Sequence, residues 1–470
     1  MADKTCDVIV LGGGPGGYVC GIRLGQLGLK VVCIEAEEYG GVCLNWGCIP
    51  SKTLISAAHL YEKAATASEM GIVVESIRVD PATLQSFKNK IVNKLTSGVR
   101  TLLKSTGGEL LEGTGRLITP DAVEVTQKSG EKIRVRAKSG VVVATGSATI
   151  EVPAFPFDGK SIIGAREAVS LGTIPRRLLV VGGGVIGLEL GMVYQKLGSE
   201  ITVVELTDGL LPGIDRECVK VVERRLKKLG ATVHTEARAE KFERADDGSL
   251  RVHVAAKDGA HVVECDVALI AVGMKPRSRG IGLEELGVEI DPRGFVTTDD
   301  KCRTNVPGVY AIGDVSGLPM LAHKAMKEGE VCAEVIAGHA AGKDWVTVPA
   351  IVFTDPEIAS AGLTDEAAKA EGYETRVGKF PFAALGRAMS LRETDGFVKV
   401  VTDTKTGRVL GIHIVGPNAS DLISEAALAL EMVATAEDVA LTVHPHPTLG
   451  EAMMEASAAA LGRAVHIANR

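Results

Sequence analysis

Short apolar runs alternate with helix-compatible stretches in the first part of the chain, and this pattern occurs twice. The first copy has apolar runs at 8–11 and 31–35, and the second has them at 178–181 and 201–205. In both copies a glycine-rich turn and a helix-compatible stretch separate the runs, and the second run ends in glutamate. Apolar runs joined through helices are typical of parallel α/β sheets. The sequence therefore predicts two units of strand, turn, helix and strand.

Two other stretches alternate apolar and polar residues. The stretch 109–138 contains turn signals at Thr119–Asp121 and Lys128–Gly130, and 238–266 shows the same alternation inside the second unit. A period of two is typical of strands with one exposed face, so each stretch is expected to form a β-meander.

The pattern changes from about Pro349 onward. Strand-like runs at 398–401 and 410–415 precede an Ala- and Leu-rich helical stretch at 422–432 and an Ala-rich tail. We expect this segment to be a separate α+β domain. The predicted fold class is therefore α/β, with two Rossmann-like dinucleotide-binding domains and a C-terminal α+β domain, and 470 residues suffice for about three packed domains.

Charge and the N-terminal sequence narrow the class of partner. Lys and Arg total 52 against 59 Asp and Glu, a net charge of -7, which favours neither nucleic acid nor an anionic membrane. The first apolar run ends at Gly12, so it is too short for a signal sequence or a membrane span. We expect a cytoplasmic protein, or one of the mitochondrial matrix or plastid if a transit peptide has been removed.

The two glycine-rich turns, Gly12–Gly17 and Gly182–Gly187, carry the first chemical signal. Glycine permits the tight turn from strand to helix and lets a pyrophosphate approach the helix N-terminus. Glu35 and Glu205 follow the first glycine of each turn at one offset, 35 minus 12 and 205 minus 182, where a carboxylate accepts hydrogen bonds from ribose hydroxyls. One such turn is often an ordinary strand–helix connection, but two matching copies favour two dinucleotide sites.

Two dinucleotides in one chain suggest FAD and a nicotinamide cofactor that exchange electrons. A 2'-phosphate would be repelled by Glu205 and needs a cation, which Leu206–Asp208 do not supply. We therefore expect NAD rather than NADP.

Cys43 and Cys48 are the second chemical signal. They precede a helical pattern from Ser51 to about Met70, and Pro50 suits a first helical turn. A helix N-terminus favours thiolate, so Cys48 is expected to be the more polarised thiol. The alternatives are a metal site or two unrelated buried cysteines. A structural zinc site needs four ligands, and no second pair of Cys or His lies close in sequence. We therefore expect no metal, although a metal site completed by a pair distant in sequence remains an alternative.

The segment His444–Glu451 is the third signal. A thiol substrate needs a base, because only the thiolate attacks a disulfide. His446 is the candidate base, and Glu451, five residues on, could orient its imidazole. The alternative is a structural or solvated histidine, which is also the interpretation that we give to His413 and His59.

The chain resembles the pyridine nucleotide-disulfide oxidoreductase family. The resemblance is carried by the segment Gly40–Lys52 together with the two glycine turns in this order, and it spans essentially the whole chain. The resemblance implies a homodimer and four domains. They are an FAD-binding domain at 1–150, an NAD-binding domain at 151–275, a central domain that completes the FAD site at 276–345, and a C-terminal dimerisation domain at 346–470.

The resemblance also implies roles for single residues. Cys43 would be the interchange thiol and Cys48 the thiol against the flavin; Lys52 would lie near flavin N5 and pair with Glu189. His446 would be the acid/base supported by Glu451. The residues expected to bind FAD are Gly12, Gly14, Gly17, Glu35, Lys52, Thr145, Gly146, Gly313, Asp314, Leu321, Ala322 and His323. Those expected at the NAD site are Gly182, Gly184, Gly187, Glu189, Glu205 and Gly273.

Within the family, the chain is most similar to the branch that oxidises protein-bound dihydrolipoamide to lipoamide with reduction of NAD. The features that favour this branch are Glu205, the Cys43–Lys52 segment and the stretch 414–426. Its partners would be lipoyl domains of 2-oxoacid dehydrogenase complexes or the glycine cleavage H protein. Glutathione reductase would require arginines for NADP, and mercuric reductase a C-terminal cysteine pair, whereas the last cysteine here is Cys332. Trp46 departs from the smaller apolar residue expected there. A reductase of another disulfide, and a flavoprotein that senses NAD, are the rival functions.

Overall fold

The computed structural model describes residues 2–469, and its first domain contains a seven-stranded sheet in the order β3-β2-β1-β6-β5-β4, with β17 paired to β6. Its strands are β1 (Ala2–Leu11), β2 (Val31–Glu35), β3 (Glu109–Glu112), β4 (Thr114–Thr119), β5 (Ala122–Thr126), β6 (Lys132–Val143) and β17 (Val309–Ala311). Its helices are α1 (Pro15–Gln26), α2 (Gly41–Asn45), α3 (Cys48–Ala65), η1 (Ala67–Met70), α4 (Pro81–Ser105), η2 (Gly313–Val315) and α8 (Ala322–Ile336).

The expected meander over 109–138 is only partly correct. Strands β4, β5 and β6 are antiparallel neighbours, but β3 pairs in parallel with β2. It does so because the chain reaches β3 through the helices α3 and α4, and a helical crossover returns a strand parallel to the one it left. Strand β17 also joins this sheet, so the segment after the second domain returns to the first.

The second domain repeats the first unit. Its parallel sheet has the order β11-β10-β9-β15-β8, and the predicted second meander is present as β12-β13-β14. Its elements are β8 (Ile162–Ile163), α5 (Ala165–Ala168), β9 (Arg177–Val181), α6 (Val185–Lys196), β10 (Glu200–Val204), α7 (Arg216–Lys228), β11 (Thr232–His234), β12 (Ala237–Arg244), β13 (Leu250–Ala256), β14 (Gly259–Cys265) and β15 (Val267–Ile270). The antiparallel pair β7 (Ser147–Thr149) and β16 (Met274–Pro276) lies where the chain passes between the two domains.

The C-terminal domain is α+β, as expected, with an antiparallel sheet in the order β18-β19-β22-β21-β20. Its elements are β18 (Ala350–Val352), β19 (Glu357–Gly362), α9 (Asp365–Ala370), β20 (Thr375–Pro381), η3 (Phe382–Ala384), α10 (Gly386–Leu391), β21 (Phe397–Asp403), β22 (Val409–Gly416), α11 (Ala419–Glu431), α12 (Ala436–Leu441) and α13 (Glu451–Ala460). Every residue of β21 and β22 is buried, because α11 and α13 pack on one face of the sheet and the second domain, including α7, packs against the other.

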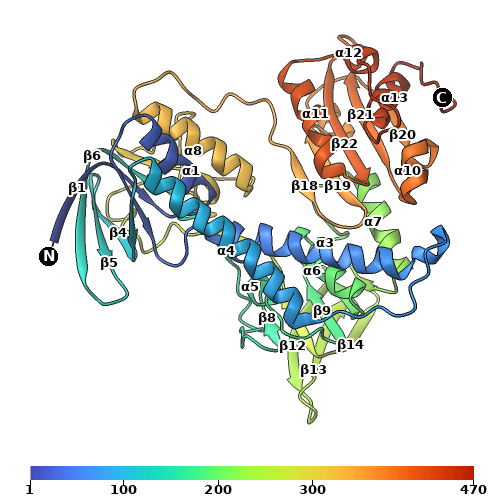
Figure 1. Ribbon diagram of the computed structural model, residues 1–470, viewed down its shortest axis with the longest axis horizontal. Helices are drawn as coiled ribbons and strands as arrows, with labels where there is room; N and C mark the ends of the chain where they lie inside the picture. Colours follow the sequence, from blue (N-terminus) through green and yellow to red (C-terminus); the bar gives the residue numbers. More distant parts are fainter. Residues whose placement is uncertain (1, 470) are drawn as a thin grey trace.

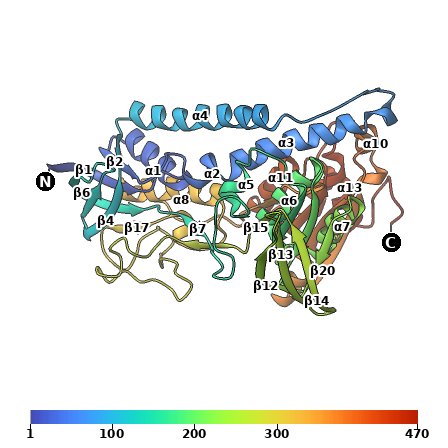
Figure 2. The same cartoon turned by 90° about the horizontal axis from the view of Figure 1, so that it is seen from below.

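Helix α3 links the three parts of the structure. It begins beside α2 in the first domain, packs on α6 of the second, and continues beneath the C-terminal domain (Figures 1 and 2). Helix α4 runs along the outside of the molecule beside it (Figure 2). Among the described helices none is both long and apolar enough to cross a membrane.

Candidate active site

Both glycine turns form open cradles at the ends of β1 and β9. Gly12 and Gly182 have φ of 114° and 107°, which side chains rarely adopt. A Cβ on Gly17 would lie 1.8 Å from the Gly12 carbonyl oxygen, so the helix can approach the strand this closely only with glycine there. The equivalent distance at Gly187 is 2.2 Å, to the Gly182 carbonyl oxygen. In contrast, a Cβ on Gly14 would meet only the Gly41 Cα, at 3.9 Å, and one on Gly184 would meet nothing within 4 Å. The cradle is therefore tight beneath and open above, as a pyrophosphate requires.

The two acids make equivalent hydrogen bonds. Glu35 Oε2 accepts from the Gly13 amide at 2.7 Å, and Glu205 Oε2 accepts from the Gly183 amide at 2.6 Å. The other oxygen of each accepts from an amide two residues on, that of Glu37 or Thr207. Burial raises the pKa of Glu35 above its ordinary value. The sequence repeat therefore extends to the hydrogen bonds that fix each carboxylate beside its cradle.

Three helices offer backbone amides at these sites. Helices α1, α6 and α8 begin without a side-chain cap in the described structure, so their first amides are free to bind an anion or a carbonyl oxygen. Leu321 is the N-cap of α8, and Ala322 and His323 are its first residues. The His323 ring lies 2.7 Å from the Pro349 carbonyl oxygen, which leaves its amide as the group that can face a flavin.

Asp314 lies in the short helix η2, which the buried ion pair of Lys324 and Glu328 holds in place. Its carboxylate accepts from the Ser147 hydroxyl at 2.6 Å. Glu328 accepts from the Gly313 amide at 2.7 Å, and the Lys324 ammonium donates to the Gly317 carbonyl at 2.9 Å. This pair was not foreseen from the sequence, because Lys and Glu one helical turn apart are typical of an ordinary solvated helix face.

Thr145, Gly146 and Gly273 flank the crossing strands β7 and β16. The Thr145 hydroxyl donates to the Arg277 carbonyl at 2.7 Å. Gly146 and Gly273 have φ of 69° and 123°, so both turns favour glycine. The two cradles, with their glycines, their carboxylates and the open amides at the helix starts, thus fit two dinucleotides, while Glu189 of the expected NAD set pairs with Lys52 of the expected FAD set.

Cys43 lies on α2, and Cys48 is the first residue of α3, three residues before the expected helix start. Gly47 serves as the N-cap and allows the earlier start. Both cysteines are partly buried free thiols. A hydrogen bond from the Cys43 thiol lowers the pKa of Cys48 to about 7; Lys52 acts in the same direction and burial opposes both. The same bond raises the pKa of Cys43. Cys48 is therefore the more polarised thiol.

Lys52 lies one turn after Cys48 and pairs with Glu189, with 2.7 Å between Nζ and Oε2. The other Glu189 oxygen accepts from the Phe353 amide at 2.9 Å, and the Phe353 ring centre is 4.6 Å from the Lys52 ammonium. Phe353 comes from the C-terminal domain and was not foreseen, because nothing in the local sequence connects it with α3. Both carboxylate oxygens of Glu189 are thus occupied by groups of this chain.

Trp46, the departure noted in the sequence, packs against the hydrophobic core that includes α6 and β9. The Arg166 guanidinium lies 4.0 Å from its ring centre and pairs with Glu37 at 2.9 Å. The larger ring is therefore accommodated by a cation–π contact to the start of the second domain.

His446 and Glu451 are brought together as expected. His446 Nδ1 donates to Glu451 Oε1 at 2.8 Å, while the Thr448 amide donates to Oε2 at 2.8 Å. Burial alone would raise the pKa of Glu451, but these two bonds outweigh it and lower the pKa. The His446 side chain is 79% exposed, and its Nε2 has no hydrogen bond in the described chain. This nitrogen is free to exchange a proton with a substrate.

His446 does not lie beside Cys43 and Cys48 of its own chain. Helix α13, which starts at Glu451, lies in the C-terminal domain, away from α2 in the first domain (Figure 2). The described structure contains no hydrogen bond between His446 and Cys43 or Cys48. The base and the thiols therefore belong to different parts of one chain.

Two other histidines, His413 and His59, make contacts within the folded chain. His413 is buried in β22, where Nε2 donates to the Leu363 carbonyl and Nδ1 lies 3.0 Å from the Ser360 hydroxyl. This agrees with the interpretation of a satisfied core histidine.

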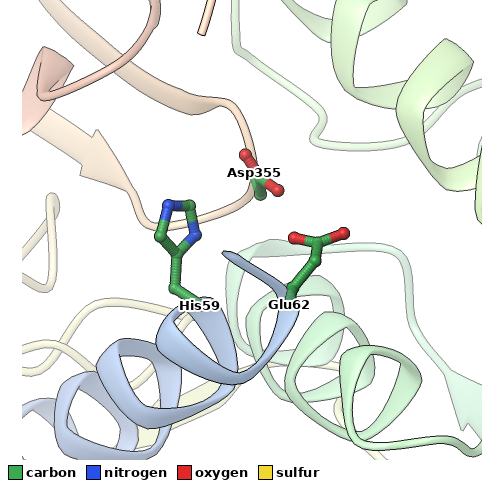
Figure 3. Close-up of side chains that lie close together, drawn as sticks. All are labelled: His59, Glu62 and Asp355. Carbon is green, nitrogen blue, oxygen red and sulfur yellow. The ribbon is translucent and has the colours of Figure 1, made fainter. Parts of the chain in front are cut away.

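His59, Glu62 and Asp355 lie close enough to resemble a metal site (Figure 3). However, Lys196 Nζ is 2.7 Å from Asp355 and 2.9 Å from Glu62, and Arg225 contacts both acids. Burial opposes ionisation of Asp355, but the two cations outweigh it and hold its pKa below the usual range. Side chains of the protein thus supply the positive charge in this cluster.

Comparisons with known proteins place this geometry in a family. Residues 6–329 match the pyridine nucleotide-disulphide oxidoreductase family, and residues 348–457 match its dimerisation domain. The chain is 45% identical over 461 residues to the dihydrolipoyl dehydrogenase of Geobacillus stearothermophilus, covering 98% of this chain and 97% of the relative. It is 46% identical over 466 residues to that of Halobacterium salinarum, covering 99% and 98%.

Among solved structures, the crystal structure of LpdA from Mycobacterium tuberculosis has a TM-score of 0.89 and 30% identity, covering 97% of this chain and 99% of the other. The expected fold class and family are thereby confirmed. With its two dinucleotide sites and its dimerisation domain, the protein is an oxidoreductase that uses FAD and NAD, and it belongs to the pyridine nucleotide-disulphide oxidoreductase family.

Proposed function

We propose that this protein is a dihydrolipoyl dehydrogenase, which oxidises protein-bound dihydrolipoamide to lipoamide and reduces NAD to NADH. The observation that supports this most directly is the asymmetric thiol pair, in which the pKa of Cys48 is about 7 and that of Cys43 is raised. The identity of 43–46% to dihydrolipoyl dehydrogenases over nearly the whole chain supports the same substrate.

The order of thiol exchange follows from this asymmetry. With Cys43 and Cys48 joined as a disulfide, a substrate thiolate attacks the Cys43 sulfur, forms a mixed disulfide and expels Cys48 as thiolate. Attack at this sulfur is favoured because the thiol with the lower pKa leaves faster. The second substrate thiolate then attacks the mixed disulfide, closes lipoamide and releases Cys43. Two electrons and two protons have left the substrate.

Each remaining residue has a role in this proposal. His446 Nε2 accepts the proton of the attacking substrate thiol, and Glu451 holds the imidazole with Nδ1 protonated. Lys52 stabilises the Cys48 thiolate, and Glu189 with Phe353 holds Lys52 in place. When bound, FAD accepts the two electrons from the thiols and NAD carries them away as NADH.

The proposed partners are lipoyl domains of 2-oxoacid dehydrogenase complexes or the glycine cleavage H protein, and the proposed setting is the cytoplasm. The dimerisation domain supports a homodimer as the working form. Because His446 does not meet the thiols of its own chain, we propose that it serves those of the second subunit.

Steady-state assays test the function. Purified protein is supplied with free dihydrolipoamide and NAD, with NADH and lipoamide, and with NADH or NADPH and glutathione disulfide. The proposal expects rapid turnover with the lipoamide pair and NAD, and little with glutathione disulfide. Preference for glutathione disulfide would contradict it and favour a reductase of another thiol.

Glu205→Arg is expected to narrow or reverse the preference for NAD over NADP. The change replaces repulsion of a 2'-phosphate by attraction, and such a contact contributes about 1.5–3 kcal/mol. It also removes the acceptor of the Gly183 amide, so NAD binding should weaken. The measurement is kcat/KM for both cofactors. Glu200→Arg, the same charge change at the other end of β10, is the matched control and should leave the preference unaltered. Equal use of both cofactors by the unmutated protein would contradict the role of Glu205.

A further inference from the structure

The loop between α12 and α13 carries two histidines in different surroundings. His446 is highly exposed and uses one ring nitrogen, as described above. The side chain of His444 is only 6% exposed, and both of its ring nitrogens face acceptors. Nδ1 lies 2.8 Å from the Thr442 carbonyl oxygen, and Nε2 lies 2.8 Å from Glu425 Oε1 on α11.

Because of these contacts, the two histidines differ in their ability to accept a proton from a substrate. A carbonyl oxygen only accepts hydrogen bonds, so Nδ1 of His444 carries a proton. Nε2 is occupied by the Glu425 carboxylate, so neither ring nitrogen of His444 offers a free lone pair to a substrate proton. The exposed Nε2 of His446 does have one. The hydrogen bonds therefore exclude His444 as the base.

His444 also faces the start of α13. Its Cδ2 atom would lie 3.7 Å from a Cβ added to Gly450, the residue that precedes Glu451. The imidazole is thus held between Glu425 of α11 and the Thr442 carbonyl, on the side of the loop that faces the helix start. Glu451 in turn binds His446 and the Thr448 amide. The charged group bonded to the ring is the carboxylate of Glu425.

We propose that His444 and Glu425 are a positioning pair for the base of the thiol reaction. Glu425 fixes the His444 ring to α11, the anchored ring holds the loop 442–450 in place, and the loop then presents His446 to Glu451 at the start of α13. This inference rests on the proposed function, since it assigns His446 the proton transfer. A group that acts through another in this way changes turnover without touching the substrate, because an error of about 1 Å in a catalytic group costs about 10²-fold in rate.

The test compares Glu425→Leu, which removes the acceptor, with Glu425→Gln, which keeps a carbonyl oxygen for the His444 N–H. His444→Asn is the second variant at the ring itself. Asp421→Asn removes the same charge one turn earlier on α11, on an exposed side chain, and is the matched control. We expect Glu425→Leu and His444→Asn to lower kcat for dihydrolipoamide about 10- to 100-fold, with KM for NAD unchanged within about twofold.

Three further expected results distinguish a positioning role of Glu425 and His444 from general damage to the fold. Glu425→Gln should retain most of the turnover, Asp421→Asn should retain all of it, and FAD reduction by NADH should be unchanged in every variant because it does not need His446. Turnover of Glu425→Leu and His444→Asn within twofold of the unmutated protein would overturn the inference.

Crystal structures of the Glu425→Leu and unmutated proteins show directly where His446 and Glu451 lie. This measurement does not depend on the identity of the substrate. The expected result is a displaced 442–450 loop with a lengthened or broken bond between His446 and Glu451, and an unaltered loop would overturn the inference. Failure of the unmutated protein to oxidise dihydrolipoamide would instead overturn the proposed function, and the two outcomes are therefore distinguishable.

Discussion

Cys48→Ser is expected to lower dihydrolipoamide oxidation by about 10³-fold or more, because the covalent route through the disulfide is lost. It should also abolish the long-wavelength absorbance that a thiolate gives beside a bound flavin. Cys43→Ser should lose turnover to a similar extent but keep that absorbance. The measurement is a steady-state assay combined with spectra of the protein after partial reduction with dithionite.

The pH dependence of this absorbance tests the same assignment. The pKa of Cys48 is lowered to about 7 from the ordinary 9.0, so the thiolate and its absorbance should form as the pH rises through about 7 and disappear below it. Lys52→Met removes one cause of the lowered pKa, and the midpoint should then move to higher pH. If the absorbance survives in Cys48→Ser and vanishes in Cys43→Ser, the two thiols have the reverse roles.

A mixed dimer of one Cys43→Ser chain and one His446→Gln chain is expected to regain activity, although each variant is nearly inactive as a homodimer. Removal of a general base costs about 10²- to 10⁴-fold. If the site is shared, one site of the mixed dimer contains both defects and the other contains neither. Half of its sites should therefore work.

The structural reason is the separation of the two groups within one chain. His446 and Glu451 are part of the C-terminal domain, whereas Cys43 is on α2 in the first domain (Figure 2). The experiment requires verified heterodimers, obtained with two different affinity tags. If each site were built within a single chain, every site of the mixed dimer would keep one defect, and the absence of any recovered lipoamide activity would show this.

The features that could be predicted from the sequence depend on residues close together in the chain. The glycine turns, the strands around them and the offset to Glu35 and Glu205 are local patterns, and each copy supported the other. The pair of Cys43 and Cys48 before a helix, and His446 followed by Glu451, are also contained in short segments. Local backbone geometry and hydrogen bonding act over such distances, so these elements could be predicted.

Contacts between groups that are distant in the chain depend on the folded arrangement and could not be predicted. Phe353 lies against Lys52 although 301 positions separate them in the chain, and Arg166 lies over Trp46 from another domain. Sequence alternation could not show that β3 pairs in parallel with β2, since the direction of a strand depends on the helices that precede it. His444 is two residues before the base in the sequence, but only the fold brings it against Glu425 on α11. Such contacts are set by how the helices and sheets pack, and packing brings together side chains that have no fixed spacing along the chain.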